Sequence, residues 1–99
     1  MTALISARAL RDLQAAVRWI SEDNPTAAKG LRNAVEKAAR QIGEHPHCGT
    51  VRPALMEERY RLLALTGFPY VIVYNAERSP PVIIRVLHGA RDLADLLRN

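Results

Sequence analysis

Three polar side chains near the end of the chain are of the types that acid–base and phosphate chemistry need. Arg85, His88 and Arg91 recur at every third position, within and just after an apolar segment. A histidine titrates near neutral pH and can serve as a general acid or base, and arginine guanidinium groups can clamp a phosphate. The plainer interpretation is that His88 is a corner or capping residue and that Arg91 pairs with Asp92 or Asp95. We favour the plainer interpretation.

Arg85 and His88 lie inside or at the end of an otherwise apolar strand. A charged side chain almost never enters a core unpaired. The strand therefore has one face open to solvent or to a partner, or it holds a polar site. Arg59, Arg61 and Arg85 can form a basic stripe across neighbouring strands that suits an acidic partner segment. A merely solvated strand face explains the same arginines equally well.

Other residues that could bind a metal or a partner give weaker signals. The run His45-Pro46-His47-Cys48 brings three potential zinc ligands together, but structural zinc sites usually take their four ligands from two separated pairs, and no second pair follows. We expect no metal site and no cofactor, since the chain also lacks a glycine-rich phosphate loop. Trp19 can anchor a partner, because aromatic residues dominate interface energetics, although half-buried packing is nearly as good an explanation.

Length and composition predict a single domain over residues 1–99, because 48% hydrophobic content suffices for one core and the chain is too short for a second. No secretory signal or membrane span is visible, and the single Cys48 cannot form an internal disulfide, so we expect a cytoplasmic protein without membrane contact. The net charge of +4 and the pI near 9.8 permit an acidic partner. They fall short of the dense Lys/Arg blocks that indicate nucleic-acid binding, so we expect no direct sequence-specific contact with nucleic acid.

The elements that must position these residues begin with three strands in the last third of the chain, at residues 59–65, 70–74 and 82–88. Their connections are too short for a crossover helix, which needs about a dozen residues, so we expect an antiparallel meander. The middle strand is apolar on both of its sides, and both sides therefore need covering.

Two amphipathic helices precede the strands. A short edge strand at residues 2–5 ends at Ser6, a good N-cap, and residues 7–22 form the first helix. A second helix covers residues 25–42, with Gly43 as the C′ residue that ends it. We expect the first helix to bury one stripe, Leu10, Leu13, Val17 and Ile20, and the second to bury another, Ala28, Leu31, Val35, Ala38 and Ile42.

Residues 44–58 have no clear period and are predicted to be a loop, and residues 92–98 form a short amphipathic helix on Leu93, Leu96 and Leu97. The expected order is β-α-α-β-β-β-α. Helices grouped together and strands grouped together indicate an α+β fold. We expect an antiparallel sheet of about four strands, with the N-terminal helical hairpin on one face and the short C-terminal helix or a partner on the other.

This pattern resembles the ParE branch of the ParE/RelE toxin superfamily, the toxic halves of type II toxin–antitoxin modules. The resemblance covers essentially the whole chain and rests on the helix break at residues 22–25, the loop with His45-Pro46 and Gly49, the strand at residues 70–74 and the closing segment at residues 84–92. It implies a small bacterial toxin neutralised by a ParD-like antitoxin. ParE-type members poison DNA gyrase, whereas RelE-type members are ribosome-dependent mRNA endonucleases.

The residues favour the ParE branch. In RelE-type proteins a few Lys/Arg residues on the sheet and a Tyr or His near the C-terminus carry out RNA cleavage, and Val71 here replaces an arginine of the central strand. The C-terminal tyrosine is also absent. We therefore expect a protein that acts by binding rather than by catalysis, with Trp19, Arg59, Arg61, Arg85 and Arg91 as candidates for contact with antitoxin or target.

Two alternatives stay open. If the chain is a RelE-like nuclease, the resemblance implies that Arg85, His88 and Arg91 are its catalytic residues. The second alternative is an inactive relative kept as an interaction or plasmid-stabilising protein. Fold-level kinship does not fix function, and no motif in the sequence is specific to a topoisomerase.

Overall fold

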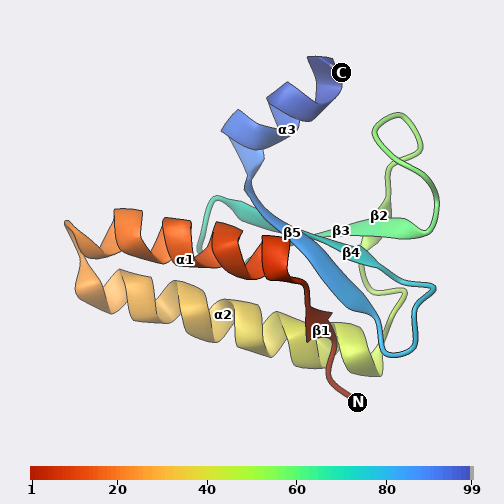
Figure 1. The fold of residues 1–99 in the computed structure, drawn as a ribbon, viewed down its shortest axis with the longest axis horizontal. Helices are drawn as coiled ribbons and strands as arrows, with labels where there is room; N and C mark the ends of the chain where they lie inside the picture. Colours follow the sequence, from red (N-terminus) through yellow and green to blue (C-terminus); the bar gives the residue numbers. More distant parts are fainter. Residues whose placement is uncertain (99) are drawn as a thin grey trace.

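The fold is a helical hairpin laid on one face of a twisted sheet, with a short helix at the C-terminus (Figure 1). The computed structural model describes residues 1–98, without the side chains of Ala94 and residues 96–98. None of the helices in this part of the chain is long and apolar enough to span a membrane. The elements follow in the order β1 (Leu4–Ile5), α1 (Ala7–Ser21), α2 (Pro25–Glu44), β2 (Thr50–Val51), β3 (Tyr60–Ala64), β4 (Tyr70–Asn75), β5 (Val82–His88) and α3 (Gly89–Arg98).

The sheet confirms the α+β class and the antiparallel meander of β3, β4 and β5. It has five strands, in the order β1-β5-β4-β3-β2, where about four were expected. The additional strand β2 lies in the segment that was predicted to be a loop. The sheet is also mixed, because β1 pairs with β5 in parallel. Both differences involve strands of two residues, whose pairing depends on where the rest of the chain places them.

The helix starts are those that the sequence predicts. The Ser6 hydroxyl accepts the N–H of Ala9 at 3.1 Å, and the Asn24 side chain accepts that of Ala27 at 3.0 Å. The end of α2 differs, because the helix continues through Gly43 to Glu44. A Cβ at position 43 would overlap the backbone of Met1, so this glycine permits a close approach of the N-terminus instead of ending the helix.

The buried stripe of α2 is confirmed in full, whereas that of α1 is rotated. The residues of α1 that lie buried are Ala9, Leu13 and Ala16, while Val17 and Ile20 pack at the margin of the core. Leu10, which was expected in the core, is 45% exposed. Two alanines in the contact let α1 approach the sheet closely, and this approach leaves the larger Leu10 on the flank.

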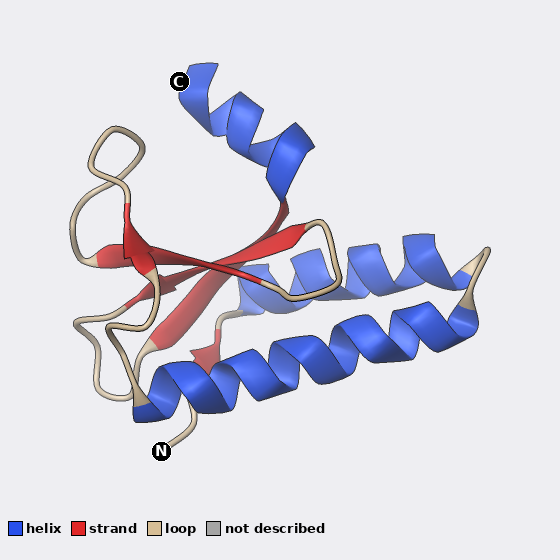
Figure 2. Ribbon diagram, turned by 180° about the vertical axis from the view of Figure 1, so that it is seen from behind, coloured by secondary structure: helices blue, strands red, loops and turns tan. Residues whose placement is uncertain are grey.

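The two sides of β4 face two different apolar clusters, as its alternation predicts. Tyr70, Ile72 and Tyr74 belong to the core beneath the hairpin. Val71 and Val73 face the other side, where residues of the loop before β3 and of α3 cover them, including Leu55, Met56 and Leu93. Figure 2 shows the hairpin and α3 on opposite sides of the sheet. The packing expected of Leu96 and Leu97 lies outside the described side chains.

Candidate functional site

The edge of β5 brings polar groups from three elements together. Strand β1 covers only Val82 and Ile83 of this edge, and beyond it the N–H of Val86 donates to Asp12 Oδ2 on α1 at 3.0 Å. The same carboxylate accepts Arg85 Nε at 2.8 Å on Oδ2 and Arg85 Nη2 at 3.2 Å on Oδ1. Paired, charge-assisted hydrogen bonds of this kind are among the stronger ones in proteins. Asp12 therefore pairs with the open edge of β5 and supplies the counter-charge for Arg85.

His88 forms the corner between β5 and α3. The His88 Nδ1 accepts the backbone N–H of Arg91 at 3.3 Å, and the backbone N–H of His88 donates to Asp92 Oδ2 at 2.7 Å. This reciprocal arrangement satisfies donors at the start of a helix as a capping box does. The imidazole also meets the Tyr70 ring edge-on, with the ring centroids 5.4 Å apart. A neutral His88 that accepts at Nδ1 carries its proton on Nε2.

The adjacent residues Arg91 and Asp92 form an ion pair in which Arg91 Nε donates to Asp92 Oδ1 at 3.1 Å. Partial burial opposes ionisation of Asp92, but the hydrogen bonds from Arg91 and from the His88 N–H outweigh it and hold the pKa of Asp92 below its ordinary value. The hydrogen bond to Asp92 in turn raises the pKa of Arg91. Both groups are therefore charged at neutral pH.

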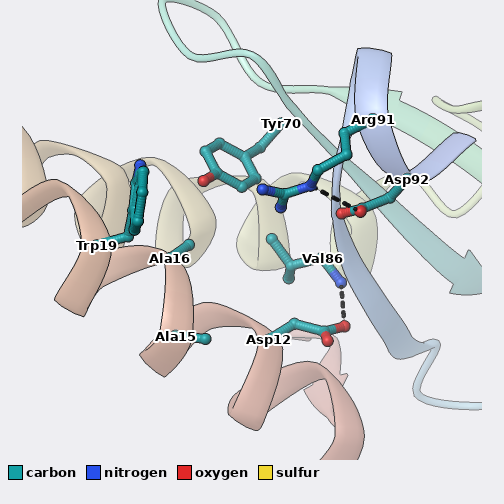
Figure 3. Close-up of a pocket in the computed structure, with 8 residues that line it drawn as sticks. All are labelled: Asp12, Ala15, Ala16, Trp19, Tyr70, Val86, Arg91 and Asp92. Atoms are coloured by element: carbon teal, nitrogen blue, oxygen red, sulfur yellow. Dashed lines mark hydrogen bonds and ion pairs between the residues drawn. The ribbon is translucent and has the colours of Figure 1, made fainter.

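A pocket of about 270 Å³ opens between α1, the ends of β4 and β5, and α3. Figure 3 shows Trp19, Tyr70 and Arg91 around its opening, with Ala15 and Ala16 on the α1 side. Trp19 is 72% exposed, far more than the half-buried position that was considered for it. The lining combines aromatic surface, a cationic head and two paired carboxylates, and this composition suits a side chain of a partner protein.

The residues predicted to contact a partner separate into two groups. Trp19 and Arg91 come together at the pocket. The three arginines of the expected basic stripe each have their own partner instead. Arg59 stacks on Tyr60 at 5.1 Å and pairs with Glu57 at 3.0 Å. Arg61 donates to two loop carbonyls, at 2.8 Å and 3.3 Å, while Arg85 binds Asp12.

Two residues that matter to this architecture were not singled out in the sequence. Asp12 lies on α1 and faces β5. Tyr74 lies in the core and has a second role, because its buried hydroxyl donates to the Pro46 carbonyl at 2.7 Å and accepts the Gly49 N–H at 2.8 Å. A buried tyrosine hydroxyl needs hydrogen-bond partners, and this need is the signal that could have indicated the second role.

The chain matches, over residues 3–93, the family model described as the ParE toxin of a type II toxin–antitoxin system, parDE. It is 33% identical over 84 residues to Toxin RelE2 of Caulobacter vibrioides, covering 85% of this chain and 90% of the relative. It is 31% identical over 90 residues to Putative toxin Y4kP of Sinorhizobium fredii, covering 91% of this chain and 90% of the relative.

A second relative from Caulobacter vibrioides, Toxin RelE3, is 30% identical over 82 residues, covering 83% of this chain and 87% of the relative. Among solved structures, the chromosomal ParDE TA system from P. aeruginosa has a chain that superposes with a TM-score of 0.74 at 18% sequence identity. The superposition covers 89% of this chain and 95% of that one. At this identity the match shows that the fold is shared.

Proposed function

Because this chain belongs to the family of ParE toxins of type II toxin–antitoxin systems, we propose that it arrests bacterial growth by binding DNA gyrase and that a ParD-like antitoxin neutralises it. A toxin of this kind acts by occupying its target and needs no catalytic residues. The family match over residues 3–93 supports this branch, as does the apolar Val71 where the nuclease branch has an arginine.

The observation that carries the proposal is the ion pair between Arg85 and Asp12. RNA cleavage needs a free cation at the scissile phosphate and a general acid or base beside it. Here Arg85 gives Nε and Nη2 to Asp12, while His88 contacts Tyr70, Arg91 and Asp92. Two of the three groups that a nuclease would use, Arg85 and His88, are engaged in holding α1, β5 and α3 together.

An antitoxin has an apolar surface to cover on the outer side of the hairpin. A groove of about 340 Å³ runs between α1 and α2, with the exposed Ile5 and Leu10 along it, the buried Val35 beneath them and polar residues at its margins. Next to it, Leu4 is 55% exposed. An amphipathic helix lays its apolar side into a groove of this kind. This surface and the exposed Trp19 support the proposal that the chain acts by binding and is held in a complex with its antitoxin.

The experiment is a DNA supercoiling assay with purified gyrase and the purified chain. We expect inhibition that increases with toxin concentration, and relief of this inhibition when the protein encoded next to this gene is added in equimolar amount. Trp19→Ser and Arg91→Gln, at the rim of the pocket, should each weaken inhibition, whereas Glu77→Gln on the distant β4–β5 turn should not. Full gyrase activity at a large excess of folded toxin would show that the target is another one.

A RelE-like, ribosome-dependent mRNA endonuclease is the second candidate, and the names of two relatives, RelE2 and RelE3, favour it. On this reading His88 supplies acid–base catalysis, and Arg85 leaves Asp12 when RNA binds. An mRNA cleavage assay with translating ribosomes tests it directly, because a gyrase-binding toxin produces no cuts.

The variant His88→Asn separates the two functions. Asparagine keeps an acceptor for the Arg91 N–H and is a good N-cap, but it cannot transfer a proton. We expect His88→Asn to keep growth arrest within about tenfold of wild type, since loss of a general acid or base costs about a hundredfold or more. A folded His88→Asn protein that no longer arrests growth, together with ribosome-dependent cuts by wild type, would favour the nuclease.

A further inference from the structure

The edge of β3 is open beyond the short strand β2. The antiparallel register pairs Leu62 with Thr50, which is the first residue of β2, so β2 does not reach Ala64. On the other side, Leu65 donates its N–H to Tyr70 at 3.0 Å, and the Arg59 carbonyl accepts the Ala76 N–H at 2.8 Å. Odd-numbered residues of β3 therefore direct their backbone groups toward β4, and even-numbered residues direct theirs away from it.

Ala64 is the even-numbered residue that β2 does not reach. Its side chain is exposed, and within residues 1–98 its N–H and C=O have no backbone partner. The edge of β5 is different, because the carboxylates of Asp12 and Asp92 accept the N–H groups of Val86 and His88. An unpaired strand edge is a template for another strand.

A groove of about 420 Å³ runs beside this edge, between β3 and α2. Its apolar part consists of Leu63 and Leu65 on the strand side and of small residues on the helix side, Gly30, Ala34 and Ala38. Small residues leave room for a side chain that enters from an added strand. The groove therefore supplies what strand addition needs besides main-chain hydrogen bonds, which is a pocket for alternate side chains.

The charge of the residues that line the groove indicates which side chains a bound segment can carry. Lys37 lines the groove, its side chain is exposed, and within residues 1–98 it has no ion-pair partner. The other polar lining residues, Asn33, Gln41 and Thr66, are neutral, and no carboxylate is among the lining residues. An acidic side chain of the occupant can therefore pair with Lys37 without repulsion.

We propose that an extended segment of the partner protein adds a strand to β3 at Ala64, placing an apolar side chain in the groove and an acidic one at Lys37. This inference rests on the proposed function, because the partner is the antitoxin. A partner helix does not fit this place, since its backbone groups are already paired and leave those of Ala64 unsatisfied. The strand binds at a surface separate from the hairpin groove and from the pocket at Trp19.

The test uses Ala64→Pro. Proline removes only the N–H that points away from β4, and edge strands tolerate it on that side. Ala64→Ser is the matched control, because it keeps the N–H. We expect both free proteins to melt as cooperatively as wild type. In titrations with the protein encoded next to this gene, Ala64→Pro should bind about tenfold or more weakly, since a carbonyl of the added strand loses its donor, and Ala64→Ser should bind as wild type does.

Two further measurements keep the proposal falsifiable if the proline variant folds poorly. Hydrogen exchange of the Ala64 amide should slow at least tenfold when wild type is in the complex, and Lys37→Glu should weaken binding more than Lys37→Gln. A complex in which the Ala64 amide exchanges as fast as in the free protein would overturn the strand, while leaving the toxin–antitoxin proposal intact. Failure of wild type to form any complex would overturn the proposed function itself.

Discussion

Asp12 and Arg85 show how one side chain can serve two structural needs. The carboxylate pairs with the guanidinium and also accepts the N–H of Val86, so it joins α1 to β5 and closes the strand edge. The side chains of Arg85 and Asp12 are 31% and 16% exposed, so solvent screens the pair only in part. Removing one partner leaves the other charge and a backbone donor without compensation, which is costly in partly buried positions.

We predict that Asp12→Asn lowers the free energy of unfolding by about 1–3 kcal/mol, because an amide oxygen replaces a carboxylate opposite Arg85. Asp23→Asn, in the exposed turn between the helices, changes the net charge equally and should have an effect within about 0.5 kcal/mol. Urea denaturation of both variants measures the difference. Equal midpoints for Asp12→Asn and wild type would mean that solvent already screens the pair completely.

At the scale of single residues, the sequence indicated that a buried charge needs a counter-charge, but it did not identify which residue supplies it. Arg85 inside an apolar strand indicated that a partner or an open face must exist, but Asp12 lies 73 residues away in sequence, and several acidic residues of the helices were equally available. Trp19 and Arg91 were predicted to contact a partner, and they share one pocket. Arg59 and Arg61 each bind a local group on the loops on either side of β2, and their contact with a partner stays a prediction.

The loop between α2 and β2 is held by the side chains of two strands. The Tyr74 hydroxyl binds the Pro46 carbonyl and the Gly49 N–H, and Arg61 binds the Gly49 carbonyl. Gly49 lies so close to Tyr74 and to β3 that a Cβ there would meet both at 2.8 Å. The loop thereby becomes a fixed element that positions β2.

Burial raises the pKa of Tyr74 to about 12. A folded-state pKa above the unfolded value of about 10 means that the folded protein keeps the proton longer. This contribution to stability is fully present below pH 10 and is lost as the pH rises toward 12. We predict that Tyr74→Phe lowers the free energy of unfolding by about 1–3 kcal/mol at neutral pH.

The melting temperature should fall less steeply between about pH 9.5 and 11.5 in Tyr74→Phe than in wild type, because the Tyr74 hydroxyl begins to lose its proton in this range. Tyr60→Phe, on the half-buried other side of the sheet, is the control for general effects of alkaline pH. A Tyr74→Phe protein whose alkaline melting profile parallels that of wild type would show that the hydroxyl does not govern this pH dependence.

Apart from the two-residue strand β2, element types and order followed from the sequence because their signals are local. Caps at Ser6 and Asn24, the helical period of α2 and the alternation of β4 each depend on neighbouring residues. The face of α1 was not predictable in the same way, because its leucines and its alanines form two overlapping stripes. Close approach to the sheet selects the alanines, and periodicity alone does not reveal how close two elements come.

For the molecule as a whole, the pairing of strands distant in sequence was the part that local patterns could not specify. Strands β1 and β2 have two residues each and occupy opposite edges of the sheet. Their positions follow from the path of the hairpin, which carries the chain from one edge to the other across a single face (Figure 2). This path also leaves two separate surfaces exposed, which are the apolar groove of the hairpin and the open edge of β3.

The exposed apolar surface of the hairpin leads to a prediction about the complete toxin–antitoxin complex. Leu10, 45% exposed, lines the hairpin groove, so Leu10→Gln should change the stability of the free toxin by less than about 0.5 kcal/mol. In the complex the same change should weaken binding about tenfold or more, because a buried leucine contributes about 1.5–3 kcal/mol. Thermal melts should show it: the partner stabilises wild type by about 2.7 kcal/mol at one hundred times the dissociation constant, and at that same concentration it should stabilise Leu10→Gln clearly less. If Leu10→Gln instead destabilises the free toxin by several kcal/mol, Leu10 belongs to the core, and the antitoxin covers a different surface.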